Sequence, residues 1–168
     1  MALPHCRGAR KVSKKIPLTQ GQFAIVDDED FDKFSVFEWH AFWNKHTNSF
    51  YAQRNIPKNG RQTSSYLHRE IMGNPPGKMV DHKNNNTLDC QRSNLRSCTK
   101  SQNQMNRKGP QRNSSSLVRG VFFNKHSGKW VVRIGKDGKK SYFGSFSSIT
   151  KATETSECAR KQLFGEFA

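Results

Sequence analysis

Acidic residues are scarce in this chain of 168 residues: 13 Asp and Glu stand against 29 Lys and Arg, which gives a formal net charge of +16 at pH 7. The basic residues are spread over both halves of the sequence. Either half could therefore bind a polyanion, and nucleic acid is the usual partner for a protein with this charge. A soluble basic protein without a polyanionic partner is the alternative that charge alone leaves open.

Hydrophobic residues are also scarce, at 33% of the chain, and no apolar run is long enough for a signal peptide or a membrane span. We therefore expect small modules instead of one large core, no membrane partner, and a cytoplasmic protein that is not secreted. Aromatic residues nevertheless reach 11%, with 12 Phe and 3 Trp, which argues against disorder throughout the chain.

Cysteine is represented by four residues without any C-x-x-C pair: Cys6, Cys90, Cys98 and Cys158. This spacing excludes a zinc ribbon, and a disulfide framework is unexpected in a chain of this length. A reducing compartment is the simplest inference. Cys90 and Cys98 could still join a histidine at a structural zinc, but no second closely spaced ligand pair supports that alternative.

Composition divides the chain into four parts. Residues 1–15 are basic and have almost no periodic apolar residues, which predicts a flexible arm that either lies on phosphates or is a plain disordered terminus. Residues 107–117 are polar, basic and rich in Gly, Pro and Ser, as is typical of a linker. We therefore expect one domain over residues 16–106 and a second over residues 118–168, together of α+β class.

The first domain begins with alternating strand and helix signals. Residues 22–26 and 49–54 predict strands. Between them, the acidic run Asp27–Asp32 leads into aromatic residues at helical spacing: Phe31, Phe34, Phe37 and Trp39. The acidic run could suggest a cation site. We favour a helix N-terminus turned away from DNA, because the helix macrodipole stabilises acidic residues in the first turn.

The span from residue 81 to residue 103 combines a carboxylate, an imidazole and two carboxamides: Asp81, His82, Asn94 and Asn103. Hydrolysis of an anionic phosphodiester needs neutralised charge and a deprotonated water. A hard cation takes oxygen ligands, which Asp81 and an asparagine carbonyl can supply. The base should titrate near neutral pH, which indicates His82.

Local signals predict a ββα unit over about residues 78–106. Residues 78–82 and 95–98 read as the two strands of a hairpin. Thr99 and Gln102 have the spacing of a capping box, which starts a helix at this point. Asn103 then falls in the first turn of that helix, where it would face back toward the hairpin.

These residues resemble phage-type HNH homing endonucleases, through Val80-Asp81-His82-Lys83-Asn84-Asn85-Asn86-Thr87-Leu88-Asp89, Arg92-Ser93-Asn94-Leu95-Arg96-Ser97-Cys98-Thr99 and Gln102-Asn103. The resemblance implies a ββα-metal fold with one Mg²⁺ or Mn²⁺ held by Asp81 and Asn103. It implies His82 as general base, oriented by Asn94, which also braces the loop. Asn103 stands where many relatives have histidine, and it keeps an oxygen ligand.

A segment before the motif, Leu67-His68-Arg69, also resembles one found in these proteins. His68 would approach the phosphate and Arg69 would neutralise backbone charge. For His68, local packing or hydrogen bonding is the equal alternative. We also expect Arg96 to contact DNA.

The second domain is predicted to contain three antiparallel strands and one helix. The strands cover residues 118–123, 128–134 and 140–146, and Asp137-Gly138 has the composition of a hairpin turn. Ser148 would cap a helix whose inward face carries Ile149, Ala152, Ser156, Ala159 and Leu163.

This segment is similar to the plant Apetala-two/ethylene-response-factor type of DNA-binding domain, through Arg119-Gly120-Val121, Gly128-Lys129-Trp130, Arg133, Tyr142-Phe143-Gly144-Ser145-Phe146 and Leu163-Phe164-Gly165-Glu166-Phe167-Ala168. The resemblance implies that the sheet face reads the major groove, with contacts from Arg119, Trp130, Arg133, Lys140 and Tyr142. Trp130 could equally anchor the fold. Val118 and Phe122-Phe123-Asn124 depart from the family pattern, which leaves the base preference open.

Together these features predict a metal-dependent endonuclease of the homing type that nicks or cleaves double-stranded DNA. The second domain would select the site, and no small-molecule substrate is expected. One active site per chain makes a nicking monomer the default, with a dimer as the alternative. The rival functions are a non-catalytic DNA-binding regulator derived from such a nuclease and an RNA-directed nuclease or binder.

Overall fold

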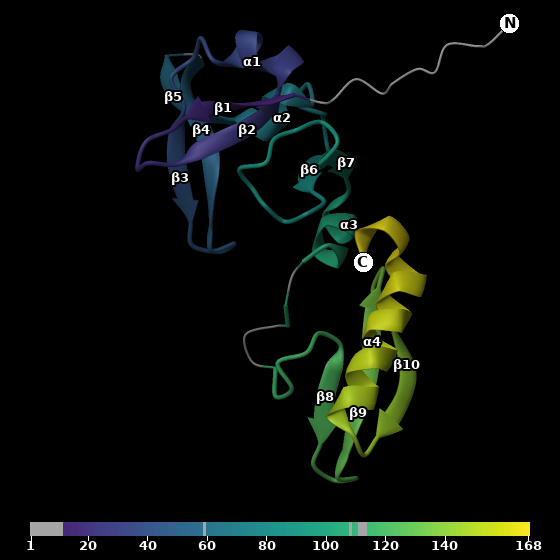
Figure 1. The fold of residues 1–168 in the computed structure, drawn as a ribbon. Helices are drawn as coiled ribbons and strands as arrows, with labels where there is room; N and C mark the ends of the chain where they lie inside the picture. Colours follow the sequence, from purple (N-terminus) through teal and green to yellow (C-terminus); the bar gives the residue numbers. More distant parts are fainter. Residues whose placement is uncertain (1–11, 59, 108, 111–113) are drawn as a thin grey trace, which may run out of the picture. The chain divides into compact units, whose positions relative to one another are not determined.

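The computed structural model describes residues 12–58, 60–107, 109–110 and 114–168, and it is of mixed α+β class with small sheets, as predicted. The chain divides into two compact units, Met1–Ser97 and Cys98–Ala168, which are considered separately (Figure 1). In the described part of the chain, no helix is long and apolar enough to cross a membrane.

The first unit is built from three small sheets and two short helices. A β1–β2 hairpin precedes α1, a meander in the order β3-β4-β5 precedes α2, and β6 pairs with β7. The bounds are β1 Ser13–Pro17, β2 Phe23–Asp27, α1 Asp28–Phe34, β3 His40–Asn44, β4 Ser49–Lys58, β5 Arg61–Tyr66, α2 Leu67–Ile71, β6 Met79–His82 and β7 Leu95–Cys98.

One core serves the whole first unit. Alternate residues of β2, Ala24 and Val26, are buried in it beside Leu67 from α2 and Val80 from β6. Strand side chains alternate between the two faces of a sheet, so this pattern places one face of β2 inward. The element that carries Asp81 and His82 is therefore anchored in the same core as the helix that carries His68.

Two predictions about the first unit are wrong in extent. The helix after Asp27 ends at Phe34 and does not reach Trp39, because the Trp39 indole Nε1 donates to the Phe34 carbonyl oxygen at 2.8 Å and closes the last turn. The predicted arm over residues 1–15 is also too long, since Ser13–Pro17 pairs with β2. Residues 1–11 of that arm lie outside the described residues.

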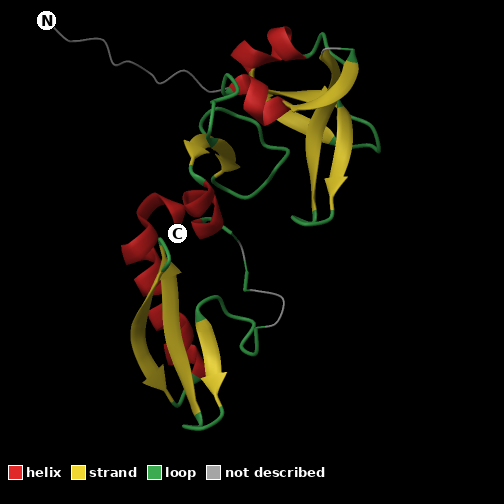
Figure 2. Cartoon of the chain, turned by 180° about the vertical axis from the view of Figure 1, so that it is seen from behind, coloured by secondary structure: helices red, strands yellow, loops and turns green. Residues whose placement is uncertain are grey.

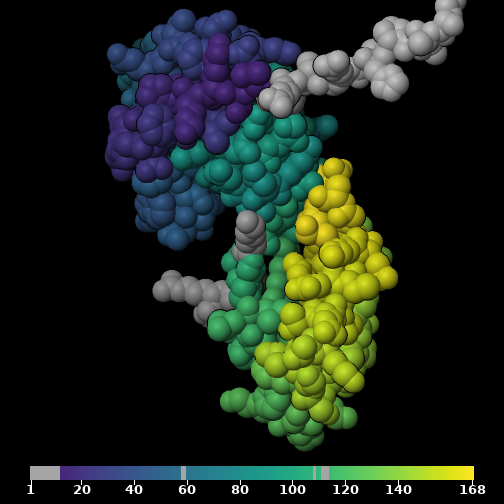
Figure 3. Space-filling model, viewed as in Figure 1, coloured from purple at the N-terminus to yellow at the C-terminus, as the bar shows by residue number. Residues whose placement is uncertain are grey.

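The second unit contains a three-stranded antiparallel sheet in the order β10-β9-β8, with α4 packed on one face. Its bounds are α3 Lys100–Met105, β8 Val121–Asn124, β9 Lys129–Lys136, β10 Lys139–Phe146, α4 Ile149–Phe164 and a 3-10 turn Gly165–Phe167. Figure 2 shows the strands in front of α4, and Figure 3 shows α4, in yellow, covering them from the other side. The turn between β9 and β10 is at Asp137-Gly138, both with positive φ, as predicted.

Small side chains bring α4 close to the sheet. Ala152, Ser156 and Ala159 are buried as predicted, whereas Ile149 is exposed at the start of the helix. Ser156 Oγ donates to the Arg119 carbonyl oxygen at 2.6 Å. The next residue, Gly120, has a φ of +79°, and a Cβ there would lie 3.0 Å from Ser156 Oγ, so this approach requires glycine.

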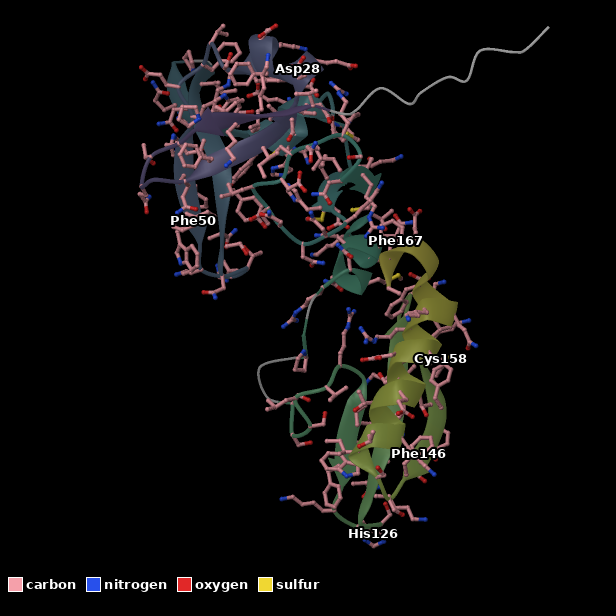
Figure 4. All side chains as sticks on the ribbon, viewed as in Figure 1. Asp28, Phe50, His126, Phe146, Cys158 and Phe167 are labelled. Carbon is pink, nitrogen blue, oxygen red and sulfur yellow. The ribbon has the colours of Figure 1, made fainter. Side chains whose placement is uncertain are left out.

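The boundary between the units differs from the predicted linker at residues 107–117. Cys98 and Met105 pack with residues of the second unit, among them Phe167, which follows α4 (Figure 4). Inside the predicted linker, Ser116 is buried and its Oγ donates to the Val121 carbonyl oxygen at 2.6 Å. The helix α3 therefore groups with the second unit, whereas the prediction assigned it to the first domain. Residues 108 and 111–113 of the linker lie outside the described residues.

Candidate active site

Asp81 and His82 are adjacent on β6, and both are buried, with exposed fractions of 7% and 4%. Arg96 on β7 donates from Nε to Asp81 Oδ2 at 2.9 Å, and its Nη2 lies 2.8 Å from the same oxygen in an ion pair. Arg96 is itself only 8% exposed, so this is a buried ion pair. Such a pair holds the carboxylate in one orientation, because removing either partner would leave a buried charge uncompensated.

His82 lies in a cluster of rings from four elements. Its ring centroid is 4.8 Å from that of His68 on α2 and 6.3 Å from that of Tyr51 on β4. Tyr66, the last residue of β5, is 5.6 Å from His68. The two tyrosines are the site neighbours that sequence reasoning missed, and no local pattern marks them, because strand pairing brings them to His82 from distant segments.

An ion pair fixes the helix that carries His68. Arg54 on β4 donates from Nε and Nη2 to the two carboxylate oxygens of Glu70 on α2, each at 2.8 Å. This parallel pair of charge-assisted bonds sets the orientation of α2 as well as its distance from β4. The Arg54–Glu70 pair therefore helps to hold α2, and with it His68, in place beside His82.

Burial keeps both site histidines neutral. It lowers the pKa of His68 to about 3, with smaller contributions from the charges of His82 and Arg69. It lowers the pKa of His82 to about 4, although the Asp81 carboxylate opposes that change. The pKa of His82 is therefore lower than the near-neutral value expected from the sequence, because the imidazole is buried; at neutral pH His82 is a free base that can accept a proton.

Acid should destabilise the first unit through His68. Its folded pKa lies below the ordinary value of 6.5, so the unfolded chain binds more protons than the folded chain as the pH falls below 6.5. This stabilisation is complete above pH 6.5, and between about pH 7 and about pH 5 we expect the free energy of unfolding to fall by about 2 kcal/mol from His68 alone. Urea unfolding at the two pH values measures it. His68→Gln should have a weaker pH dependence, whereas a variant of the exposed His46 should match wild type.

Asn94 organises the loop that joins β6 to β7. Its Oδ1 accepts from the Asn84 backbone N–H at 3.0 Å, and its Nδ2 donates to the Asp89 carbonyl oxygen at 2.7 Å. The Asn94 carbonyl oxygen accepts from the N–H of Lys83, the residue after His82. These contacts hold the loop in one conformation. They fix the backbone next to His82 and do not involve its side chain.

The acidic run at the start of α1 holds the same loop. Arg92 donates from its side chain to both carboxylate oxygens of Asp30, at 2.8 and 2.7 Å, and from its backbone N–H to Asp27 Oδ2 at 2.8 Å. Asp27 and Asp30 are buried. The run therefore forms a helix start, as predicted, and it also has a function in holding the loop that the sequence did not reveal.

Asn103 lies on α3, in the second unit, whereas Asp81 and His82 belong to the first. The capping box is confirmed: Thr99 Oγ1 accepts from the Gln102 N–H at 3.2 Å, and Gln102 Oε1 accepts from the Thr99 N–H at 2.9 Å. Asn103 is in the first turn of this helix. A shared cation between Asp81 and Asn103 stays a prediction.

The cysteines beside the motif are packing residues. Cys90 is fully buried in the core of the first unit, and Cys98 is packed in a core of the second. Burial raises the pKa of the Cys90 thiol, which opposes the thiolate that zinc binding requires. Among the described residues, no group of three His, Cys, Asp or Glu side chains could hold a metal ion.

Several residues predicted to contact DNA are engaged within the protein. Arg96 pairs with Asp81, His68 is buried, and Arg69 donates to the carbonyl oxygens of Lys78 and Pro75 at 3.1 and 3.2 Å. In the second unit, Arg119 donates to three carbonyl oxygens at the end of α3, those of Gln104, Met105 and Arg107, each at 2.7 Å. These contacts give the four residues structural roles in the free protein.

The face of the sheet away from α4 carries the exposed candidates. Val132 and Ile134 are buried in the cores against α4, so Arg133 between them points to the opposite face. The residue paired with Arg133 on β10, Tyr142, is 60% exposed. The guanidinium carbon of Arg133 lies 5.5 Å from the centroid of the exposed Phe122 ring. Lys140 pairs with Gly135 on this face.

Trp130 belongs to the other side of the sheet. It packs against the core under α4, and its ring centroid is 4.9 Å from that of Phe123. Its role as a fold anchor, one of the two alternatives predicted, is the one that its contacts fit. Arg133, Lys140 and Tyr142 remain the sheet residues open to a ligand.

Comparison with protein families gives one match, to the residues that carry this site. Residues 70–105 match the family model described as HNH endonuclease. The matched segment runs from α2 to the end of α3 and includes Asp81, His82, Asn94 and Asn103. It indicates a nuclease domain, with DNA as the implied substrate. No curated protein and no solved structure matches the chain.

Proposed function

We propose that the protein is a metal-dependent DNA endonuclease of the homing type that hydrolyses one phosphodiester bond at a time in duplex DNA. The observation that supports it most is the position of the family match, which falls on the segment where Asp81 and His82 lie side by side on one strand. The buried Arg96 pair and the loop braced by Asn94 keep that strand end rigid. Rigid placement of this kind is what catalysis by positioning requires.

The residues present fit a hard divalent cation such as Mg²⁺ or Mn²⁺. Arg96 pairs with Asp81 through Oδ2, and a carboxylate has about four acceptor positions on its two oxygens, so this ion pair is compatible with metal ligation. Asp81 and the amide oxygen of Asn103 would hold the cation. When bound, the cation supplies positive charge that stabilises the phosphate in the transition state and the departing 3′ oxygen.

The chain's own side chains then divide the remaining work. An imidazole nitrogen of His82 accepts a proton from the attacking water, whose oxygen forms the new bond to phosphorus as the bond to the 3′ oxygen breaks. Arg96 keeps Asp81 oriented, and Asn94 fixes the backbone that follows His82. The departing 3′ oxygen takes a proton from solvent water and His82 releases its proton to solvent, so the products carry 5′-phosphate and 3′-hydroxyl ends.

The second unit would select the DNA site through the sheet face that carries Phe122, Arg133, Lys140 and Tyr142. Guanidinium groups can contact guanine edges, and lysines can bind phosphates. This part of the proposal rests on exposure and charge, together with the similarity to the plant domain.

Plasmid nicking tests the proposed activity. Supercoiled plasmid should be converted to open circles with Mg²⁺ or Mn²⁺, a chelator should stop the reaction, and added metal should restore it, because the active site needs the cation's charge. The nicked strand should accept radiolabelled phosphate at its 5′ end only after phosphatase treatment. Duplex DNA that is bound but never cut with any metal would favour a regulator, and preferential cutting of structured RNA would favour the RNA-directed alternative.

A further inference from the structure

A hollow of about 780 Å³ in the second unit collects positive charge. It lies at the start of β8: Val121, the first residue of β8, pairs with Val132, and just before it the Gly120 carbonyl oxygen accepts from the Arg133 backbone N–H at 2.9 Å. None of the described residues that line the hollow is acidic, and five are basic: Arg107, Arg119, Arg133, Lys140 and Arg160. Two of these, Arg133 and Lys140, also belong to the exposed sheet face.

The basic side chains in the hollow differ in whether their N–H groups have hydrogen-bond acceptors. Arg119 is bound to the carbonyl oxygens at the end of α3, and its guanidinium carbon lies 5.5 Å from the centroid of the Phe164 ring. Arg160 on α4 differs, because its buried Nε has no hydrogen-bond partner among the described residues. A buried Nε–H group without an acceptor is unfavourable in the free protein, and an incoming oxyanion that accepts from it would remove that penalty.

Repulsion among these cations favours an anionic ligand in the hollow. Burial first, and then the charges of Arg160 and Arg107, lower the pKa of Arg119. A group of like charges with no carboxylate among them destabilises the free fold, and a bound phosphate would reverse the effect.

We propose that this hollow binds a phosphate group, with Arg160 as its main ligand and Arg107 as a second, and that in the complex the group is a backbone phosphate of the DNA that lies on the sheet face. The DNA source rests on the proposed function, since Arg133 and Lys140 join the hollow to that face. Arg119 acts as a positioning residue, because its bonds tie α3, which precedes Arg107, to the wall of the hollow.

Arg160→Gln tests the proposal, with Lys161→Gln as its matched control. Both remove one positive charge from α4, but the exposed Lys161 does not line the hollow. Duplex binding is measured by fluorescence anisotropy in chelator over a range of salt. Loss of one phosphate contact should weaken binding about fivefold near 0.15 M salt and reduce the slope of log K against log salt by about 0.9. Lys161→Gln should change both much less.

Thermal unfolding separates a ligand role from a structural one. Arg160→Gln removes a like charge, so its melting temperature should stay the same or rise while DNA binding weakens. A lower melting temperature with binding reduced only in proportion to the unfolded fraction would overturn the proposal. So would an affinity and salt slope equal to those of wild type. Arg107→Gln should repeat the loss of affinity, which keeps the test independent of one variant.

The ¹⁵N signal of Arg160 Nε distinguishes the two sources of phosphate. A shift both with inorganic phosphate and with duplex shows that the hollow binds free anions as well as DNA. A shift with duplex but not with inorganic phosphate assigns the hollow to the DNA backbone. No shift with either would refute the site. If wild type never nicks DNA but Arg160→Gln still binds it more weakly, the phosphate site stands while the proposed endonuclease activity fails.

Discussion

His82→Ala should lower the rate of plasmid nicking by about 10²–10⁴-fold while leaving duplex binding within about twofold of wild type. The imidazole would be lost from the end of β6, where no other base is adjacent to Asp81 in the sequence, but the sheet face proposed to contact DNA would be unchanged. Single-turnover nicking at saturating enzyme measures the chemical step, and anisotropy in chelator measures binding.

The control for this substitution is His46→Ala, which removes an exposed histidine in the turn between β3 and β4. It should nick at the wild-type rate. Equal nicking by His82→Ala and wild type would show that another group accepts the proton, even if the protein is an endonuclease. Loss of both nicking and binding would indicate that His82 is needed for the fold.

Arg96→Met should give the largest loss of stability of any single change at the site. It leaves the Asp81 carboxylate, 7% exposed, without its cation, and removing one partner of a buried ion pair costs about 3–5 kcal/mol. Urea unfolding of wild type and variant measures the difference. The first unit has a single core that includes Val80 and Leu95 on either side of the pair, so the loss should extend to the whole unit.

Two controls make the Arg96 result specific. Arg61→Met changes the same residue type at an exposed position on β5 and should be close to neutral. The double variant Asp81→Asn/Arg96→Met removes both charges and should regain much of the lost stability, because no uncompensated ion remains. A double variant as unstable as Arg96→Met alone would contradict the explanation by charge and would point to lost packing of the arginine side chain.

Sequence predicted the parts of this fold that depend on local signals. The strands β6 and β7, the capping box at Thr99 and the turn at Asp137-Gly138 each follow from a few neighbouring residues. Strands β1 and β5 were missed, because their sequences, SKKIP and RQTSSY, lack a regular apolar alternation. Pairing with β2 and β4 makes them strands, and that interaction is tertiary.

Contacts between distant segments explain what the sequence could not give at the site. The Arg92 side chain bonds to Asp30, 62 residues earlier, and no local pattern links the two. Tyr51 lies near His82 because β4, the central strand of the β3-β4-β5 sheet, brings it there from a distant part of the sequence. Arg96 and Arg119 are both expected to contact DNA, Arg119 through the resemblance to the plant domain, and in the free protein they bond to Asp81 and to the end of α3. Composition cannot distinguish a guanidinium that binds DNA from one that holds the fold.

The most direct test of the account is the metal dependence of plasmid nicking by wild type and by Asp81→Asn, with Asp28→Asn as the control at an exposed carboxylate. Wild type and the control should share one Mg²⁺ saturation curve. Asp81→Asn leaves the buried Arg96 without its carboxylate and should be less stable than wild type, so nicking is compared at a temperature where circular dichroism shows every variant folded. There it should nick only at far higher Mg²⁺ concentration, or not at all, since it loses the charged ligand. A Mg²⁺ curve for Asp81→Asn that coincides with wild type, or nicking by wild type in excess chelator, would contradict a metal-dependent site at Asp81 and His82.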